Sequence, residues 1–536
     1  MTPESSRQRF LQLLDAYRQD SGSIPLSAGE SNGSLTDQID PLLKSLRDLR
    51  DGDRKLQCEY NEEWDDWDDM GEDEFVFSDP DGVLSGIGRA FALLHSCLDQ
   101  AEYIKGAELA KLLSELEVPV SGDFDEDTMD IDDLFDYDLL KVNGKQAVTE
   151  AVCLLCAGSE AQERAEVMLT AMERFGETSV SLEHIMRMIP EKLDLEAFLP
   201  SWFEALAKRS GSGTEQMLRE ALDMMRDESA VLELASRYAE SHPTLYLSIL
   251  RTGLENTAQE EMVRIGLRGM RETPPEHPVR SDIALLTAGY ALKVQQIQIA
   301  EDCWMEAFRT LPTVVNYLRL RLRAGNWEHY AEAARLAYES YYAKKPSWNQ
   351  RDLAVLLFFD ERFEEMLTRF MAVEEGIGWS STFMKEGIAL LLMLLWEPQK
   401  GSAPGMAAMS TRAMSACDFH ADAYCEGTGI DPAPSGTASF RECFQTWKKQ
   451  VDIPEAVCEQ WFGRIEKWVS LRVSAIMQAN RRNYYDECAA FVAALGEAEE
   501  SRGKAGRKGS LMRQYKTEYS RRRAFHEELR RFGMKE

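Results

Sequence analysis

Residues 313–337 read TVVNYLRLRLRAGNWEHYAEAARLA, and this stretch decides the fold. Thr313 is a residue type that caps helix N-termini, and apolar side chains recur after it at three- and four-residue spacing as far as Leu322. Residues 324–327 then form a Gly-containing turn. Small side chains such as Ala334 allow the following helix to pack closely on the first. The stretch therefore predicts an antiparallel helix pair.

The same scheme recurs on both sides of this pair. The further predicted helices are Asp282 to Leu292 and Ile297 to Phe308 before it, and Leu353 to Phe359 and Phe363 to Phe370 after it. The turns within the three pairs, near Gln295, Asn326 and Glu361, recur at close to the roughly 34-residue period of tetratricopeptide-like hairpins. The sequence thus predicts an all-α fold, an α-solenoid of antiparallel, tetratricopeptide-like helix pairs with acidic loop insertions.

Composition shifts along the chain predict four regions. They are an acidic N-terminal helical region with acid-rich loops (1–150), the helical-repeat solenoid (151–396), an irregular insertion with loops rich in Gly and Pro (397–439), and a C-terminal helical region with a basic end (440–536). In the last region we expect three helices and then one basic helix around residues 512–532. Strands are expected to be absent or marginal.

The overall charge excludes one broad class of function. The 536 residues carry a formal net charge of −31, so the average surface repels phosphates and cannot bind nucleic acid over its whole face. The ten cysteines mostly lie in apolar helical patterns, which is typical of buried thiols in a reducing compartment. The apolar run Gly387 to Trp396 is shorter than the roughly 20 residues of a membrane-spanning helix, and the N-terminus has no secretory pattern. We expect a cytoplasmic protein that does not contact membranes.

Two acid-rich segments interrupt the N-terminal region. Residues 61–80 hold ten Asp or Glu and no Lys or Arg, interleaved with Trp64, Trp67, Phe75 and Phe77. Such a segment docks on a basic partner or on the chain's own C-terminus, or it is a solvated loop with a few core anchors, which is the simpler interpretation.

Residues 123–138 hold nine acids, and Asp123, Asp125 and Asp127 match the opening of a calcium-binding EF-hand loop. Thr128 stands where that loop needs Gly, and Leu134 stands where it needs a bidentate Glu. Specific calcium binding is therefore not expected.

The C-terminal end has the opposite sign. From Ser501 to Glu536 there are twelve Lys or Arg and four acids, a local balance of +8. The candidate contact surface comprises Arg507, Lys508, Arg513, Lys516, Arg521, Arg522 and Arg523, with Arg481 and Arg482 nearby. These cations contact nucleic acid or a partner, or they cap the solenoid and neutralise its acidic body, which we favour.

Other motifs lack the spacing that their chemistry needs. Cys153 and Cys156 form a lone CxxC, and Cys417, His420 and Cys425 lack a clear fourth zinc ligand. The GxSxG spacing at 29–33 has no strand before it, and the Gly- and Lys-containing stretch 503–510 departs from the phosphate-binding loop pattern. We predict no metal, no cofactor and no enzyme activity; a site built from scattered carboxylates on facing helices is the remaining enzymatic alternative.

Several strings resemble the helical region that follows the zinc finger in bacterial SWIM zinc-finger family proteins. They lie at 311–327, 353–363, 378–385 and, in pieces, between 483 and 530. The family's CxC and CxH zinc motif is absent, so no zinc ligand can be carried over. The resemblance implies a repeat scaffold whose finger was lost or is encoded separately.

These observations predict a non-enzymatic scaffold that binds a protein partner through helix faces, with no cofactor. The alternative is an accessory subunit of a nucleic-acid-processing complex. That role would use the basic end for nucleic-acid contact, and its binding would fall steeply with added salt.

Overall fold

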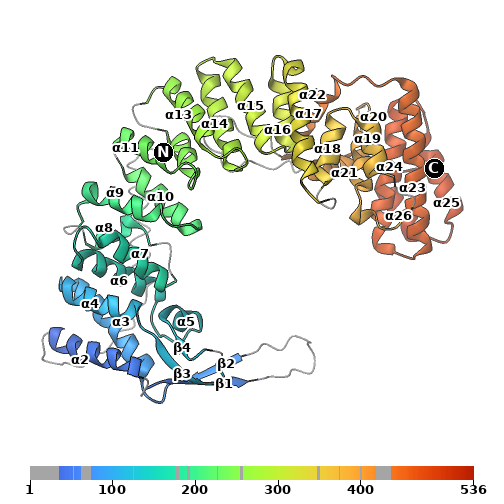
Figure 1. The fold of residues 1–536 in the computed structure, drawn as a ribbon. Coiled ribbons are helices and arrows are strands. Elements are labelled where there is room, and N and C mark those ends of the chain that lie inside the picture. The colour runs from blue at the N-terminus through green and yellow to red at the C-terminus, as the bar shows by residue number, and fades with distance from the viewer. Residues whose placement is uncertain are drawn as a thin grey trace. The chain divides into compact units, whose positions relative to one another are not determined.

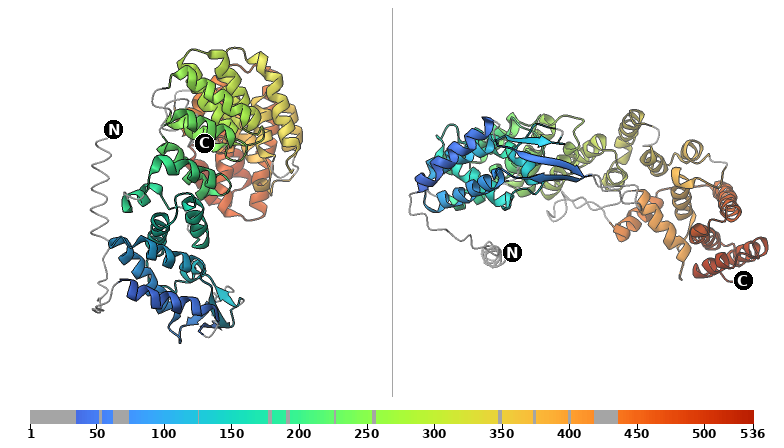
Figure 2. Two further views of the ribbon diagram at one scale, coloured as in Figure 1. Left: turned by 60° about the vertical axis from the view of Figure 1, so that its left-hand side comes forward. Right: turned by 90° about the horizontal axis from the view of Figure 1, so that it is seen from below.

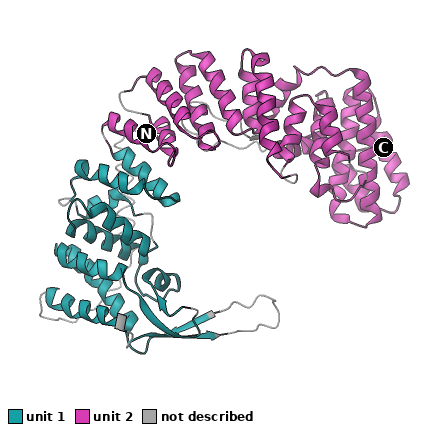
Figure 3. Ribbon diagram, in the orientation of Figure 1, with its two compact units in different colours: residues 1–224 teal, residues 225–536 magenta. Residues whose placement is uncertain are grey.

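The computed structural model is mostly helical and separates into two compact units, unit 1 (residues 1–224) and unit 2 (residues 225–536), which Figure 3 distinguishes by colour. The residues that the structure describes are 35–51, 54–61, 74–124, 126–176, 180–189, 193–225, 227–253, 257–346, 350–372, 375–398, 401–417 and 436–536.

Unit 1 combines helices with one small sheet (Figure 1). Its elements are α2 (Leu35–Arg47), η1 (Asp48–Asp51), β1 (Leu56–Asn61), β2 (Glu74–Ser78), α3 (Val83–Asp99), α4 (Tyr103–Ser114), β3 (Val118–Gly122), β4 (Thr128–Met129), α5 (Ile131–Asp136), α6 (Gly144–Gly158), α7 (Arg164–Arg174), α8 (Leu182–Met188), α9 (Leu195–Leu206) and α10 (Ser212–Met224).

The sheet is small, which agrees with the expectation that strands are absent or marginal. Its strand order is β2-β1-β3-β4. β1 pairs antiparallel with β2 and parallel with β3, and β3 pairs antiparallel with the short β4. In β1 the buried Leu56 and Cys58 alternate with the exposed Gln57 and Glu59, which is the period of a half-buried strand. This alternation is short and lies beside acid-rich segments, so periodicity alone did not reveal it.

Glycines let two helices of unit 1 approach closely. A Cβ atom added at Gly106 in α4 would lie 2.6 Å from a methyl carbon of Leu154 in α6, and one at Gly158 would lie 2.5 Å from the Cβ of Ala107. The contact buries the apolar face of α6, as the packing of small residues between helices allows.

Unit 2 consists of helices and their connections, with no strand among its described residues. Its elements are α11 (Glu228–Arg237), α12 (Thr244–Thr252), α13 (Gln259–Glu272), α14 (Val279–Lys293), α15 (Ile297–Thr310), α16 (Val314–Arg323), α17 (Trp327–Ala343), α18 (Arg351–Phe359), α19 (Phe363–Phe370), η3 (Trp379–Ser381), α20 (Met384–Leu395), α21 (Pro404–Ala416), α22 (Gly436–Lys448), α23 (Glu455–Gln478), η4 (Arg482–Tyr484), α24 (Tyr485–Ser501), α25 (Arg507–Glu518) and α26 (Arg523–Arg531).

The predicted central helix pair is present as α16 and α17. The Thr313 hydroxyl accepts a hydrogen bond from the Asn316 backbone N–H at 3.2 Å, which makes Thr313 the N-cap of α16. The predicted flanking helices correspond to α14, α15, α18 and α19, and helices adjacent in this series pack on one another. Two of the predicted turns are tight, because Gln295 and Glu361 adopt positive φ angles of 60° and 62° after their helices.

Two C-terminal predictions need correction. The range 397–439, expected to be an irregular insertion, contains α21, which packs against α20 and α24. Pro404 occupies the first turn of α21, where a missing N–H costs nothing, so the Pro-Gly pair starts a helix here and does not form a loop. The single basic helix expected around 512–532 is two helices, α25 and α26, separated at residues 519–522.

The most apolar helix belongs to the core of unit 2. The apolar run from Gly387 forms most of α20, whose side chains are almost all buried. Among the described residues, no helix combines the length and apolar character needed to cross a membrane.

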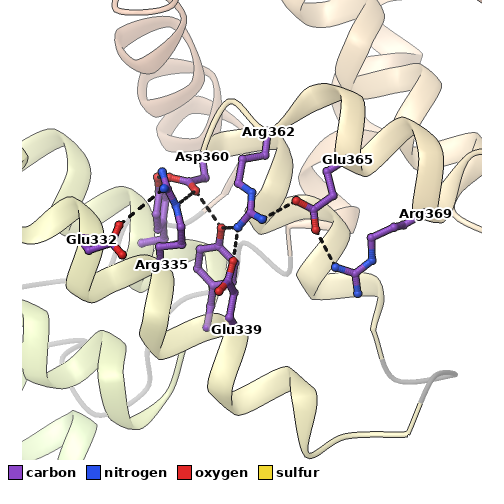
Figure 4. A network of polar contacts seen from close by, with 9 residues as sticks. Glu332, Arg335, Glu339, Asp360, Arg362, Glu365 and Arg369 are labelled. Atoms are coloured by element: carbon purple, nitrogen blue, oxygen red, sulfur yellow. Dashed lines mark hydrogen bonds and ion pairs between the residues drawn. The ribbon is translucent and has the colours of Figure 1, made fainter.

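A buried carboxylate joins successive helices of unit 2 (Figure 4). Asp360, whose side chain is 7% exposed, follows α18 and accepts hydrogen bonds from the hydroxyls of Tyr317 (3.0 Å) and Tyr338 (2.8 Å). It also pairs with Arg335 at 3.2 Å, while Arg362 donates to the Tyr338 hydroxyl at 3.0 Å. The network extends through Glu339, Glu365 and Arg369. One carboxylate thus links α16, α17 and the turn between α18 and α19.

Replacing Asp360 with Ala should lower the free energy of unfolding of unit 2 by about 2–3 kcal/mol, because two buried tyrosine hydroxyls lose their acceptor. Urea unfolding and amide hydrogen exchange in α16 and α18 would measure the effect. Glu332→Ala is the matched control, since Glu332 is exposed and its contact with Arg335 is longer, at 3.6 Å. Equal effects of the two substitutions would contradict a stabilising role for the Asp360 network.

Candidate interaction surfaces

The residues of the predicted basic surface lie on α25, in the turn that follows it and at the start of α26. α25 and α26 both pack on α24, whose middle is buried. The Phe525 ring of α26 lies 5.7 Å from Tyr485 and 6.1 Å from Tyr515, measured between centroids. Both views of Figure 2 show these orange and red helices grouped at the C-terminal end of unit 2. The basic end is therefore a packed part of unit 2.

Its first two predicted contact residues are held by carboxylates of the same unit. Arg507 lies 2.6 Å from both Glu499 and Glu466, and Lys508 lies 3.8 Å from Glu500. The Glu499 side chain is only 4% exposed and also pairs with Lys504 at 3.2 Å. These contacts raise the pKa of the Arg507 guanidinium, although burial opposes the shift. Much of this positive charge is already compensated within the chain.

The other predicted residues divide into held and exposed side chains. Lys516 pairs with Glu536, and Arg522 donates to the Met477 carbonyl at 2.8 Å. Arg513 is exposed and donates to the Gly509 carbonyl of its own helix at 3.3 Å. The remaining four arginines, Arg481, Arg482, Arg521 and Arg523, are also exposed. The structure therefore does not gather the predicted residues into one uniformly exposed basic face.

An ion cluster lies where two strings of the SWIM resemblance meet. Arg472 in α23, whose side chain is 3% exposed, lies 2.8 Å from Glu487 in α24, and Lys385 in α20 lies 2.6 Å from the same carboxylate. Burial alone would raise the pKa of Glu487, but Lys385 and Arg472 lower it below its usual value. Arg472 also stacks over the rings of Trp379 (5.4 Å) and Tyr484 (5.1 Å). The cluster joins three helices.

A second surface lies on the sheet of unit 1. Five aromatic rings, from Tyr60, Phe75, Phe77, Phe124 and Tyr137, form a connected cluster with centroid separations of 5.2 to 6.5 Å. Tyr60 and Phe75 are register partners on β1 and β2, so they share one face of the sheet. Tyr60 is 37% exposed and Tyr137 is 42% exposed, and the three phenylalanines are half-buried. We call these five residues the aromatic surface.

Acidic residues adjoin the aromatic surface, one by a contact and others in the sequence. The Tyr60 N–H donates to the Asp123 carboxylate at 3.1 Å, and Asp136 and Asp138 flank Tyr137 in the sequence. Burial and three neighbouring aspartates raise the pKa of Asp132. No Lys or Arg occurs in either acid-rich segment, 61–80 or 123–138. Sequence analysis singled out Phe75 and Phe77 but not Tyr60, Phe124 or Tyr137, because only the sheet and α5 bring the five together. Trp64 and Trp67 lie outside the described residues.

The thiols singled out by the sequence are buried. Cys153 and Cys156 lie inside α6, and burial raises the pKa of both, that of Cys156 to about 11. Cys417 is buried at the end of α21, while His420 and Cys425 lie outside the described residues. Within the described ranges, no group of three or more Cys, His, Asp or Glu side chains has the geometry to hold a metal ion.

The two glycine motifs have different outcomes. The GxSxG stretch at 29–33 lies outside the described residues. The stretch 503–510 begins as the connector between α24 and α25, with positive φ angles at Gly503 (96°) and Gly506 (74°), and continues into α25. The beginning of this stretch agrees with the predicted basic connector.

Comparison of the sequence with models of protein families gave no match, and the comparisons with curated proteins and with solved structures gave none either. The similarity to the SWIM family thus stays a prediction.

Replacing Glu487 with Gln should destabilise unit 2 by about 3 kcal/mol at pH 7, because Arg472 and Lys385 would lose their buried counter-charge. The pKa of Glu487 is lower in the folded state than in the unfolded state, where it is near 4.5. The ionised carboxylate therefore makes its full contribution to the free energy of unfolding above pH 4.5, and this contribution is lost as the pH falls through the pKa of the folded state. Urea unfolding of the wild type and of Glu487→Gln at several pH values would show that the difference between their free energies of unfolding decreases as the pH is lowered. The exposed neighbour Asp486→Asn is the control; a difference independent of pH would contradict the ion-pair explanation.

Proposed function

We propose that this chain is a non-enzymatic helical scaffold that binds a protein partner, with its antiparallel helix pairs forming a tetratricopeptide-like α-solenoid. The sequential packing of α14 to α19 supports the solenoid part of the proposal. In such folds each helix pair buries its apolar face against its neighbours, which leaves long helix faces available to partners. The proposal needs no cofactor.

The aromatic surface is the observation that carries the binding part of the proposal. Single exposed apolar residues are ordinary, but a contiguous apolar patch with a polar rim is typical of an interaction site. Tyrosine and phenylalanine supply large contact areas at low entropic cost, and they are enriched where proteins bind one another. Five such rings lie in contact here, and three of them belong to β1 and β2.

The chemistry around the aromatic surface favours a basic partner. Asp123 and the aspartates that flank Tyr137 attract Lys and Arg and repel acidic chains, and aromatic faces also bind guanidinium groups. β2 lies at the edge of the sheet and has no strand partner on its outer side in the part of the chain that the structure describes. An extended segment with alternating basic and apolar side chains fits this edge, because it can add as a further strand while its cations meet the acids.

The nucleic-acid alternative has weaker support. Arg507 and Lys508 are paired with Glu499, Glu466 and Glu500, so phosphate contact through them would first have to break these ion pairs. A phosphate contact that avoids this cost would use the exposed arginines, which are Arg481, Arg482, Arg513, Arg521 and Arg523.

The proposal predicts saturable binding of a synthetic peptide that alternates Arg with Val, measured by fluorescence anisotropy with the full chain. The double substitution Tyr60→Ser and Tyr137→Ser should weaken binding at least about tenfold, as expected when contact residues worth about 1 kcal/mol each are removed. Ile104→Ser is the matched control, because Ile104 is an apolar residue of unit 1 that is 78% exposed on α4, outside the aromatic surface.

Two outcomes would count against this proposal. Equal affinity of the wild type and the Tyr60/Tyr137 variant would remove the aromatic surface from the binding site. Tight binding of single-stranded RNA or duplex DNA that falls steeply with salt and is lost in Arg513→Gln with Arg521→Gln would favour the accessory role in nucleic-acid processing. A peptide with Glu in place of Arg provides the charge control.

A further inference from the structure

A cavity opens between α25 and α26 of unit 2. Its volume is about 360 Å³, and its lining residues are Lys516, Ser520, Arg523, His526, Glu527 and Arg530. Four of these six side chains carry or can acquire positive charge, and one is an acid. This balance is unusual in a chain with a net charge of −31.

Helical spacing explains why these side chains meet. Arg523, His526, Glu527 and Arg530 follow the i, i+3, i+4, i+7 pattern of one face of α26. Lys516 lies in the last turn of α25, and Ser520 follows in the turn between the two helices. The break at residues 519–522 folds the two helices against α24, so it creates a cavity that one continuous helix would not have.

His526 is the unusual member of this group. Its side chain is 5% exposed, its ring hydrogen-bonds to the backbone of Tyr519, and its Nε2 atom is buried without a hydrogen-bond partner among the described residues. Burial lowers the pKa of His526, and the nearby Arg530 and Lys516 lower it further, while Glu536 opposes them. A buried ring nitrogen without a partner is costly in a folded protein, and a bound ligand is one way to satisfy it.

We propose that this cavity binds one phosphate-type oxyanion, with Arg523 and Arg530 as bidentate donors and the protonated Nε2 of His526 as the buried donor. Lys516 and the Ser520 hydroxyl complete the cationic and polar lining. Guanidinium groups match the geometry of phosphate oxygens, and His526 gains a partner when the anion is present. Because Nε2 is covered in the free protein, binding requires a lining side chain to move. The exposed Arg523 and Arg530 have the rotamer freedom to do so.

Two carboxylates restrict the ligand. Glu527 lines the cavity, and Glu536 holds Lys516. A neighbouring cavity of about 610 Å³ shares Glu527, and its other charged lining residues are Asp486, Glu528, Arg482 and Arg531. A polyanion that continued into the second cavity would also meet Asp486 and Glu528, and the acids there outnumber the arginines by three to two, whereas a single phosphate group would meet only Glu527. The chemistry therefore favours a phosphomonoester, on a phosphorylated protein segment or on a small molecule, over nucleic acid.

The test follows the imidazole signals of histidine-labelled full chain by NMR while inorganic phosphate is added at constant ionic strength. The chain has seven histidines, and His526→Gln identifies the signal of His526. We expect a saturable change at His526 and a rise in its pKa, because the bound anion stabilises the imidazolium. Arg530→Gln and, separately, Arg523→Gln should each weaken binding at least about tenfold, because each removes a bidentate pair of charge-assisted hydrogen bonds.

Arg521→Gln is the matched control, because it removes an exposed arginine from the turn beside the cavity without removing a lining residue. Retained phosphate affinity in this variant, with loss in Arg523→Gln and Arg530→Gln, would support the site. No saturable change at His526, or equal loss in all three variants, would overturn it. Circular dichroism checks that each variant is folded.

Binding measurements with further ligands distinguish the possible sources of the phosphate group. A phosphoserine peptide that binds more tightly than inorganic phosphate would identify a protein ligand, and equal affinities would favour a small molecule. An oligonucleotide that binds more tightly than both and is weakened by Arg521→Gln would replace the proposal with a nucleic-acid contact.

Discussion

A carboxylate can stay charged inside a protein only when cations or hydrogen-bond donors surround it, and unit 2 meets this constraint where its helices join. Asp360 is held by two tyrosines and an arginine, Glu487 by Arg472 and Lys385, and Glu499 by Arg507 and Lys504. Glu497 accepts hydrogen bonds from the first N–H groups of α21, at Gly405 and Met406. In each case one acid specifies which elements are neighbours.

The same constraint explains the sign of the C-terminal end. An acidic chain that buries carboxylates must supply cations to them, and α25 does so for the acids at the end of α24. The +8 balance of the last residues is therefore in part a compensation for acids elsewhere in unit 2. This agrees with the favoured interpretation of the basic end, and it leaves only part of that charge for a ligand.

Local signals predicted the helices well. Thr313 as a cap, the apolar spacing of α14 to α19 and the turns at Gln295 and Glu361 are encoded within a few residues of sequence, and the structure has them at the predicted positions. The break between α25 and α26 was not predictable in this way, because residues 519–522 contain neither Gly nor Pro and the break depends on packing against α24. The aromatic surface and the cavity at His526 were missed for the same reason, since each joins residues from separate elements.

The parallel pairing of β1 with β3 has a kinetic consequence. The two strands are separated in the sequence by β2, α3 and α4, and Leu56 is the register partner of Val120. Contacts between such distant segments form only after the chain between them has ordered. Closing a long loop costs conformational entropy, and this cost comes before the contact supplies any favourable free energy. During synthesis, the β1–β2 hairpin therefore leaves the ribosome well before the neighbour that buries its inner edge. Its aromatic side chains pass through an interval in which chaperones or other nascent chains are their available partners.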